Sequence, residues 1–337
     1  MRRINVGIIG TGWCGGIRAN ACAANPLVDG LYIAEIKPER LAEVAATTNP
    51  RKATTEWREL LDIKEIDAIY ISATPETTHY PMARDCLNAG KHVFLEKPIA
   101  STVSDAQKIT AAGAKAKAKG NLFIGHICRF NPRYRMAKQA IAAGKIGRIV
   151  AMNSRRNIPA AWTPEILNKI GPIVGDAIHD TDLMLWFTGD RIVSAYAQTV
   201  DVRGLRHPDI GQTMYRFAGG ATATLETVWC MPEKTPFDID ERMSIIGDAG
   251  LIHVQDTFPN LGIVSSEKLH SPDTTYWPVF DGPRGGALRE EFSYFASCAL
   301  KGEAPAIGRP EDAAAALQAT LAAEESARTG QVVRIDG

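Results

Sequence analysis

The sequence predicts an α/β protein with two domains: a doubly wound parallel sheet, then an α+β domain with an open, mainly antiparallel sheet. Two observations predict this. The first third of the chain alternates short β-branched runs with helical patterns, which implies right-handed βαβ units. Beyond about residue 126, alternating runs are separated by Gly, Pro and Asp turns, which favours antiparallel strands. We therefore expect domains over residues 1–125 and 126–337.

The elements of the first domain follow from its apolar runs. Each run is short, and a helical pattern separates it from the next, so the connections are of the crossover type that a parallel sheet needs. The expected strands are 4–9, 30–36, 66–72, 91–97 and 121–127, with helices at about 13–24, from 38, between the third and fourth strands, and over 104–120.

The second domain is expected to carry most of its strands before its last helices. Its strands are predicted over 148–157, 191–204, 212–220, 221–231 and 242–250, with helices over 175–187, 287–301 and 311–329. An exposed flat face of such a sheet rarely stays bare, so a homodimer or homotetramer is expected.

Composition narrows the possible partners. The 337 residues are 45% hydrophobic, with 38 basic and 38 acidic side chains, and this neutral balance argues against nucleic acid. The sequence has no apolar run long enough to span a membrane, and "MRRINVGIIG" enters a strand at once, leaving no room for a signal peptide. Six scattered cysteines without a C-x-x-C pair indicate neither disulfides nor a thiolate metal site. We expect a cytoplasmic protein without a metal.

A glycine motif follows the first strand. Gly10, Gly12 and Gly15 form G-x-G-x-x-G between a strand and a helix, where glycines permit close approach of a pyrophosphate to the helix N-terminus. Glu35 ends the second strand, where an acid accepts hydrogen bonds from ribose hydroxyls and repels a 2′-phosphate. This favours NAD over NADP, although Lys37 and Arg40 weaken the preference. The alternative is a glycine turn beside a surface glutamate.

Three further segments lie at carboxyl ends of predicted strands: "SATPETTH", "EKP" and "GHICRFNP". Lys97 would stand at the reactive end of a dinucleotide, where it either exchanges protons near neutral pH or stays charged and polarises a substrate oxygen. Pro98 restricts the backbone there and is able to form a cis bond that aims the amine. The alternative is a local ion pair of Glu96, with Lys97 pointing to water.

Helical spacing in "GDAIHDTDLMLWF" places Asp176, His179 and Asp180 on one side of a helix. A carboxylate that orients an imidazole, which then takes a hydroxyl proton, suits alcohol oxidation. The alternatives are a structural histidine near an acidic helix start, or a His/Asp metal site that would want more ligands.

Together these stretches carry a resemblance. "VGIIGTGWCG", "AEIKPERL", "ISATPETTHYPMARDCLNAGKHVFLEKPIA", "RFNP", "GKIGRI", "IHDTDLMLW" and "PEDAAAALQATLAAEESARTGQVV" resemble, in order, the Gfo/Idh/MocA family of NAD(P)-dependent oxidoreductases. The resemblance implies a dinucleotide-binding Rossmann domain, a substrate-binding and oligomerisation domain, and substrates such as sugars and inositols.

The resemblance also implies roles for residues. Lys97 and His179 become the catalytic lysine and the histidine acid/base. The family commonly has an Asp four residues before that histidine, where this chain has Gly175; we expect Asp176 to substitute, since i,i+3 neighbours share a helix face. The implied cofactor contacts are Gly10, Thr11, Gly12, Trp13, Cys14, Gly15, Glu35, Ile36, Ala73, Thr74, Pro75, His79, Glu96 and Lys97.

Substrate contacts are predicted from residue type. Arginine forks and an aromatic plane suit a polyhydroxylated or carboxylated ring, which suggests Arg129, Arg155 and Trp162 beside Lys97, Asp176 and His179. The alternatives are an exposed strand face for "NSRRN" and a core position for Trp162.

The first functional hypothesis is an NAD-dependent dehydrogenase acting on a secondary alcohol of a sugar, sugar derivative or cyclitol. The second is NAD-dependent glycoside cleavage by transient oxidation and elimination, in which net NADH does not accumulate. The third is a nucleotide-sensing regulator without turnover, for which the glycine at 175 leaves room and against which Lys97 and His179 argue.

Overall fold

A computed structural model describes residues 2–116, 120–255, 257, 260–279 and 282–336. The chain forms two compact units. The first comprises Met1–Phe130 and Tyr276–Ala314, and the second Asn131–Thr275 and Ala315–Gly337. Among the residues described, none of the helices is both long enough and apolar enough to span a membrane.

The first unit is built on a parallel sheet in the order β3-β2-β1-β4-β5-β6. The order reverses direction at β1, which confirms the expected doubly wound arrangement. Its elements are β1 (Ile4–Ile9), α1 (Trp13–Ala23), β2 (Val28–Ala34), α2 (Pro38–Thr48), β3 (Lys52–Thr54), η1 (Trp57–Leu60), β4 (Ala68–Ile71), η2 (Glu76–Thr78), α3 (His79–Asn88), β5 (His92–Glu96), α4 (Val103–Ala116), β6 (Leu122–Gly125), η3 (Ile127–Phe130) and α7 (Gly286–Lys301). Of the helix expected over 104–120, residues 117–119 lie outside the described residues.

The strand sequences of this sheet are apolar because both faces are covered. All four residues of β4 and of β6 are buried. Helices α1 and α7 pack together, and α3 packs against α4 and β5. Rows of β-branched and aromatic side chains therefore find apolar neighbours above and below the sheet, as parallel strands require.

Helix α7 differs from the expected division, which placed all of 126–337 in the second domain. It belongs with the first unit, because its aromatic residues complete the core there. Phe295 lies 5.4 Å from Phe94 of β5 and 5.8 Å from Phe123 of β6, measured between ring centroids. The chain therefore returns to the parallel sheet after building the second unit's strands.

The second unit contains a seven-stranded sheet in the order β12-β11-β7-β10-β9-β8-β15. Every neighbouring pair is antiparallel except β7 with β10, which confirms the expected mainly antiparallel sheet. Its elements are α5 (Pro132–Ala142), β7 (Ile149–Pro159), η4 (Ala160–Trp162), η5 (Ile173–Ala177), α6 (Ile178–Thr188), β8 (Ile192–Val200), β9 (Ile210–Phe217), β10 (Thr222–Met231), β11 (Asp240–Gly247), β12 (Leu251–Gln255), β13 (Ile263–Val264), β14 (Leu269–His270) and β15 (Val333–Arg334). The last long helix, α8 (Pro310–Thr329), contributes residues 315–329 to this unit.

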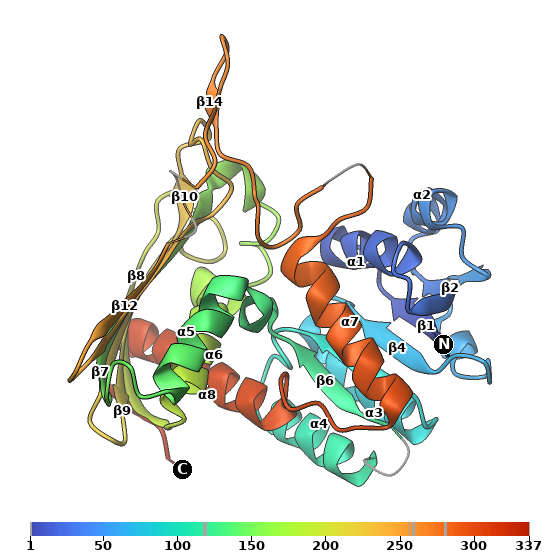
Figure 1. The fold of residues 1–337 in the computed structure, drawn as a ribbon, viewed down its shortest axis with the longest axis horizontal. Coiled ribbons are helices and arrows are strands. Elements are labelled where there is room, and N and C mark those ends of the chain that lie inside the picture. The colour runs from blue at the N-terminus through green and yellow to red at the C-terminus, as the bar shows by residue number, and fades with distance from the viewer. Residues whose placement is uncertain (1, 117–119, 256, 258–259, 280–281, 337) are drawn as a thin grey trace. The chain divides into compact units, whose positions relative to one another are not determined.

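The two faces of this sheet have different surroundings. Helices α5 and α6 lie along one face, as Figure 1 shows. On that face, Tyr215 of β9 is buried and its hydroxyl lies 3.1 Å from Thr181 Oγ1 of α6. On the other face, Met214 of β9 is 51% exposed. The strands therefore alternate between buried and solvent-facing residues, as expected for a sheet covered on one side.

Candidate functional site

The glycine loop between β1 and α1 has the geometry of an anion site. Gly10 has φ +83°, and a Cβ there would lie 2.7 Å from the Ser72 carbonyl oxygen. A Cβ on Gly15 would lie 2.0 Å from the Gly10 carbonyl oxygen, whereas one on Gly12 would meet nothing within 4 Å in the described chain. Helix α1 begins at Trp13 without a side-chain cap among the described residues, so its first N–H groups face the open side at Gly12. This arrangement suits a pyrophosphate.

Glu35 is held at the carboxyl end of β2. It is buried, and its Oε2 accepts hydrogen bonds from the Thr11 backbone N–H at 2.7 Å and from Thr11 Oγ1 at 3.0 Å. The neighbouring Ile36 is 75% exposed. Arg40 Nε donates to the Thr11 carbonyl at 2.7 Å, and its guanidinium also pairs with Glu43. The acid therefore lies against the glycine loop, where a ribose of a bound dinucleotide would reach it.

The loops after β4 and β5 are joined by His79. Its Nε2 lies 2.9 Å from the Ala73 carbonyl oxygen, while Nδ1 lies 3.1 Å from the Pro98 carbonyl oxygen. The peptides Thr74–Pro75 and Lys97–Pro98 are both cis, as expected for Pro98. Because His79 is 2% exposed, its ring lies behind these loops, and its contacts hold their backbone in position. Burial lowers the pKa of this imidazole.

Glu96 belongs to a buried ion-pair network, which decides between the two interpretations of "EKP" for this residue. Its Oε1 accepts from Arg18 Nε at 3.1 Å and from the Tyr70 hydroxyl. Arg18 also pairs with Glu291 Oε2 of α7 at 2.6 Å. Burial alone would raise the pKa of Glu96, but Arg18 and Tyr70 outweigh it and the pKa lies below its usual range. As a partner of Arg18, Glu96 anchors the strand end that carries Lys97, and its expected contact with the cofactor stays a prediction.

Trp13 and Cys14 begin α1 with different exposures, and Cys14 is half-buried. Trp13 is 65% exposed and meets Trp277 edge to face, with 5.7 Å between ring centroids. The Cys14 thiol lies inside, 3.3 Å from Glu96 Oε1. Burial, together with the negative charge of Glu96, raises the pKa of Cys14 to about 12, which favours the protonated thiol over the thiolate.

In the second unit, His179 lies buried in the first turn of α6. The adjacent Asp180 ties this turn to the sheet: its Oδ2 accepts from Arg156 Nε of β7 at 2.6 Å, and Arg156 also pairs with Glu241 of β11 at 3.1 Å. Burial raises the pKa of Asp180 to about 6, although Arg156 favours its charged form. The network holds the position of His179 relative to the sheet.

Asp176 lies in η5, a π-helical turn that leads directly into α6. Its Oδ2 accepts a hydrogen bond from Trp229 Nε1 of β10 at 3.2 Å. π-Helical turns inside helices are frequent at functional sites. The sequence singled out Asp176 but not Trp229.

Two arginines expected to bind substrate are engaged elsewhere. Arg129 is 1% exposed and pairs with Asp312 of α8 at 2.9 Å, inside the first unit. Arg155 points to the open face of the sheet, because its neighbour Arg156 points toward α6 and side chains alternate along a strand. There it pairs with Glu226 and Asp240. Trp162, by contrast, is 41% exposed in η4 and not part of the core.

Sequence reasoning missed Arg18, Glu291, Trp229 and Trp277. The signal for Arg18 was a lone arginine among small and apolar residues of α1, in "GGIRANACA". A charged residue on a buried helix face needs an oppositely charged partner, but the partner Glu291 lies 273 residues away in the sequence.

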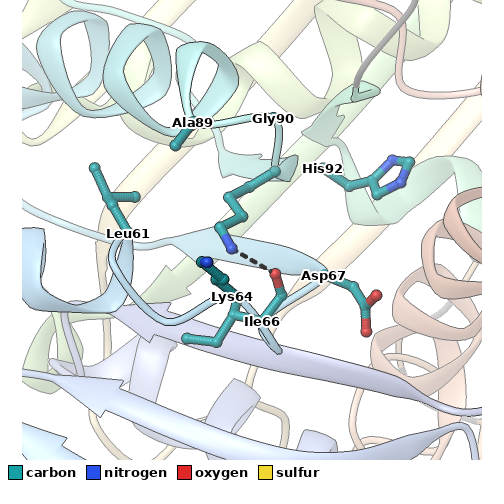
Figure 2. A pocket seen from close by; sticks show the side chains of 8 residues that line it. Leu61, Lys64, Ile66, Asp67, Ala89, Gly90 and His92 are labelled. Carbon is teal, nitrogen blue, oxygen red and sulfur yellow. Dashed lines mark hydrogen bonds between the residues drawn. The ribbon is translucent and has the colours of Figure 1, made fainter.

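A shallow hollow lies at the amino ends of β4 and β5 (Figure 2). Its Lys91 donates from Nζ to the carbonyl oxygens of Ile63 and Ile66, both at 2.8 Å. Ligands of doubly wound sheets bind at the carboxyl ends of the strands, so this hollow is not the dinucleotide site.

Comparisons with known proteins agree with this geometry. Residues 4–126 match the profile of GFO/IDH/MocA, an oxidoreductase family with an NAD-binding Rossmann fold, and residues 134–253 match the GFO/IDH/MocA C-terminal domain. Inositol 2-dehydrogenase 2 of Saccharopolyspora erythraea is 30% identical over 255 residues, which cover 74% of this chain and 72% of that protein. Myo-inositol 2-dehydrogenase of Thermotoga maritima is 25% identical over 342 residues, covering 99% of each.

A similar fold is found in the solved scyllo-inositol dehydrogenase from Lactobacillus casei with bound NAD(H) and scyllo-inositol. The TM-score is 0.85 at 23% identity, and the match covers 99% of each chain.

Proposed function

This chain belongs to the Gfo/Idh/MocA family of NAD-binding oxidoreductases, and we propose that it oxidises a secondary alcohol of a cyclitol or sugar. The observation that carries the proposal is the shared edge of the parallel sheet, where the glycine loop, Glu35 and the strand end before Lys97 come together. The substrate class rests on relatives named as inositol dehydrogenases, which align over up to 99% of the chain.

NAD+, when bound, supplies the hydride acceptor for such an oxidation. The N–H groups at the start of α1 would hold its pyrophosphate, and Glu35 would accept hydrogen bonds from a ribose. A 2′-phosphate would meet the charge of Glu35, which supports NAD over NADP. The residues present therefore fit the cofactor.

The proton chemistry falls to three residues in this proposal. His179 takes the proton of the reacting hydroxyl, and Asp176 supports the resulting imidazolium. Lys97 polarises the same oxygen as it becomes a carbonyl. Trp162, exposed in η4, is proposed to contact the ring of the substrate. Arg129 and Arg155 have no part in it, because both are paired elsewhere.

The test is absorbance at the NADH wavelength with NAD+ and a panel of cyclitols, aldoses, anhydrosugars and glycosides. Growth of the signal with a cyclitol or sugar is the expected result and identifies the substrate. Silence across the panel, with NAD+ shown to bind, would contradict the proposal. Product analysis of the glycosides then separates transient-redox cleavage, which yields a free aglycone, from a regulator, which leaves every compound intact.

We place the protein in the cytoplasm as part of this proposal. The six cysteines all lie in the described residues and none of them forms a disulfide, which suits a reducing compartment.

We also propose a homodimer or homotetramer assembled through the open face of the second unit's sheet. That face carries Met214, 51% exposed. Met214→Glu is expected to shift the mass measured by light scattering at micromolar concentration toward one chain, because it replaces an exposed apolar side chain of that face with a charge that would be buried in the contact. Met136→Glu on α5, where the side chain is 68% exposed, serves as the matched control. A monomeric parent protein would contradict the proposal.

A further inference from the structure

No side chain fits at position 175. A Cβ built on Gly175 would lie 2.6 Å from Trp229 Cη2 and 3.1 Å from Trp229 Cζ2, with Ile170 at 3.2 Å. Real Cβ atoms do not approach that closely, so either the indole or the π-helical turn would have to move. The benzo ring of Trp229 occupies the space into which a side chain four residues before His179 would project.

Trp229 has little freedom to move aside. Trp229 is 2% exposed, and its backbone N–H donates to the backbone carbonyl of Asp209 at 2.8 Å. Its backbone carbonyl accepts from Thr163 Oγ1 and from an Arg203 guanidinium N–H, both at 2.9 Å. Arg203 in turn pairs with the Asp209 carboxylate at 2.6 Å. The ring packs in an apolar cluster with Ile158, Leu167, Ile170, Leu205 and Ile239. The cluster and the backbone contacts hold the indole in one orientation.

The edge of the same indole carries the hydrogen bond to Asp176. We infer that Trp229 is a positioning residue: it excludes a carboxylate from position 175 and orients the one at 176 through its Nε1–H. A buried donor to a charged oxygen both satisfies that oxygen and restricts its rotamer. The inference rests on the proposed function, in which Asp176 supports His179.

A double-mutant cycle tests the coupling. Trp229→Phe removes the N–H but keeps a ring, and is expected to lower kcat roughly tenfold, the loss of one hydrogen bond to a charged group. KM and the Kd for NAD+ are expected to stay within about twofold, because no substrate contact is removed. Asp176→Ala is expected to lower kcat roughly 100-fold. The double variant should match Asp176→Ala alone, because Trp229 acts through that carboxylate.

The outcomes separate this inference from the proposed function. If Asp176→Ala impairs turnover but the two losses multiply, Trp229 does not act through Asp176 and the inference fails while the dehydrogenase proposal stands. Full activity of Asp176→Ala would remove that residue from the mechanism and overturn both the role and the inference. Trp186→Phe is the control, since it removes an indole N–H from the far end of α6 and should leave kcat unchanged.

A measurement of Tm tests the same contact without an activity assay, and a turnover assay complements it. Gly175→Ala is expected to lower the Tm of the parent, because its Cβ meets Trp229, and to lower it less in the Trp229→Phe background, which lacks the benzo ring. Gly175→Asp, added to the Asp176→Ala variant, should not restore turnover, because the new side chain meets Trp229. Equal Tm losses in both backgrounds, or restored turnover, would show that Trp229 does not block this position.

Discussion

Lys97→Met is expected to lower kcat by about three orders of magnitude and to leave NAD+ binding within about threefold. Methionine keeps the length and apolar stem of lysine but removes the charge and the protons. The residue directly follows β5, and the preceding Glu96 is anchored by Arg18, so the backbone of this segment should survive the substitution. The measurement is NADH formation with the substrate found in the panel, together with NAD+ titration by calorimetry.

Lys97→Arg divides the two roles that the sequence left open. Arginine keeps the positive charge but does not release a proton near neutral pH, so a residual rate well above that of methionine indicates polarisation, and an equal loss indicates proton exchange. Lys108→Met on α4, where the exposed amine pairs with Asp105 and lies over the Tyr80 ring, is the control for loss of a lysine charge. Unchanged turnover of Lys97→Met would remove Lys97 from the mechanism.

The parts of the site that could be predicted from sequence are local. The glycine loop of Gly10, Gly12 and Gly15 is recognised from the strand before it and the helix after it, and Glu35 from the strand that it follows. The order of elements along the chain was therefore sufficient to predict both. The whole parallel sheet follows from the same logic. A strand buried on both faces must be apolar throughout, and that pattern is visible without knowing its neighbours.

The missed parts depend on contacts between distant segments. Arg18 and Glu291 are 273 residues apart in sequence, so no spacing rule links them. Arg155 and Arg156 are adjacent on β7 and point to opposite faces, but the sequence does not tell which face meets α6, because both side chains are arginines. Trp229 shows the same limit, since its ring explains the glycine at 175 from another strand.

The ion pair between Glu96 and Arg18 also connects separate elements of the first unit. Its carboxylate lies beside the Arg18 guanidinium, which also stacks 5.4 Å from the ring of Phe94 and holds Glu291 of α7. Arg18 of α1 thus pairs with two carboxylates. Through Glu96 it holds the end of β5 before Lys97, and through Glu291 it holds α7. The Glu96 carboxylate is satisfied by partners within the protein, and the cofactor contact expected of this residue stays a prediction.

Arg18→Met is expected to lower the free energy of unfolding of the first unit by about 3 to 5 kcal/mol, because it leaves two carboxylates buried without their cation. Urea titration followed by far-UV circular dichroism measures the loss. Arg51→Met is the control: its pair with Asp29 is solvent-exposed, where an ion pair contributes at most about 1 kcal/mol.

The triple variant Arg18→Met, Glu96→Gln, Glu291→Gln separates the charge from the packing. If uncompensated charge causes the loss, neutralising both acids should recover a large part of it, since removing a whole buried ion network costs far less than removing one partner. No recovery would show instead that the guanidinium acts mainly through packing on Phe94. A loss below about 1 kcal/mol for Arg18→Met alone would mean that protons or water replace the guanidinium beside the two carboxylates. Glu96 would then not depend on Arg18 for its position.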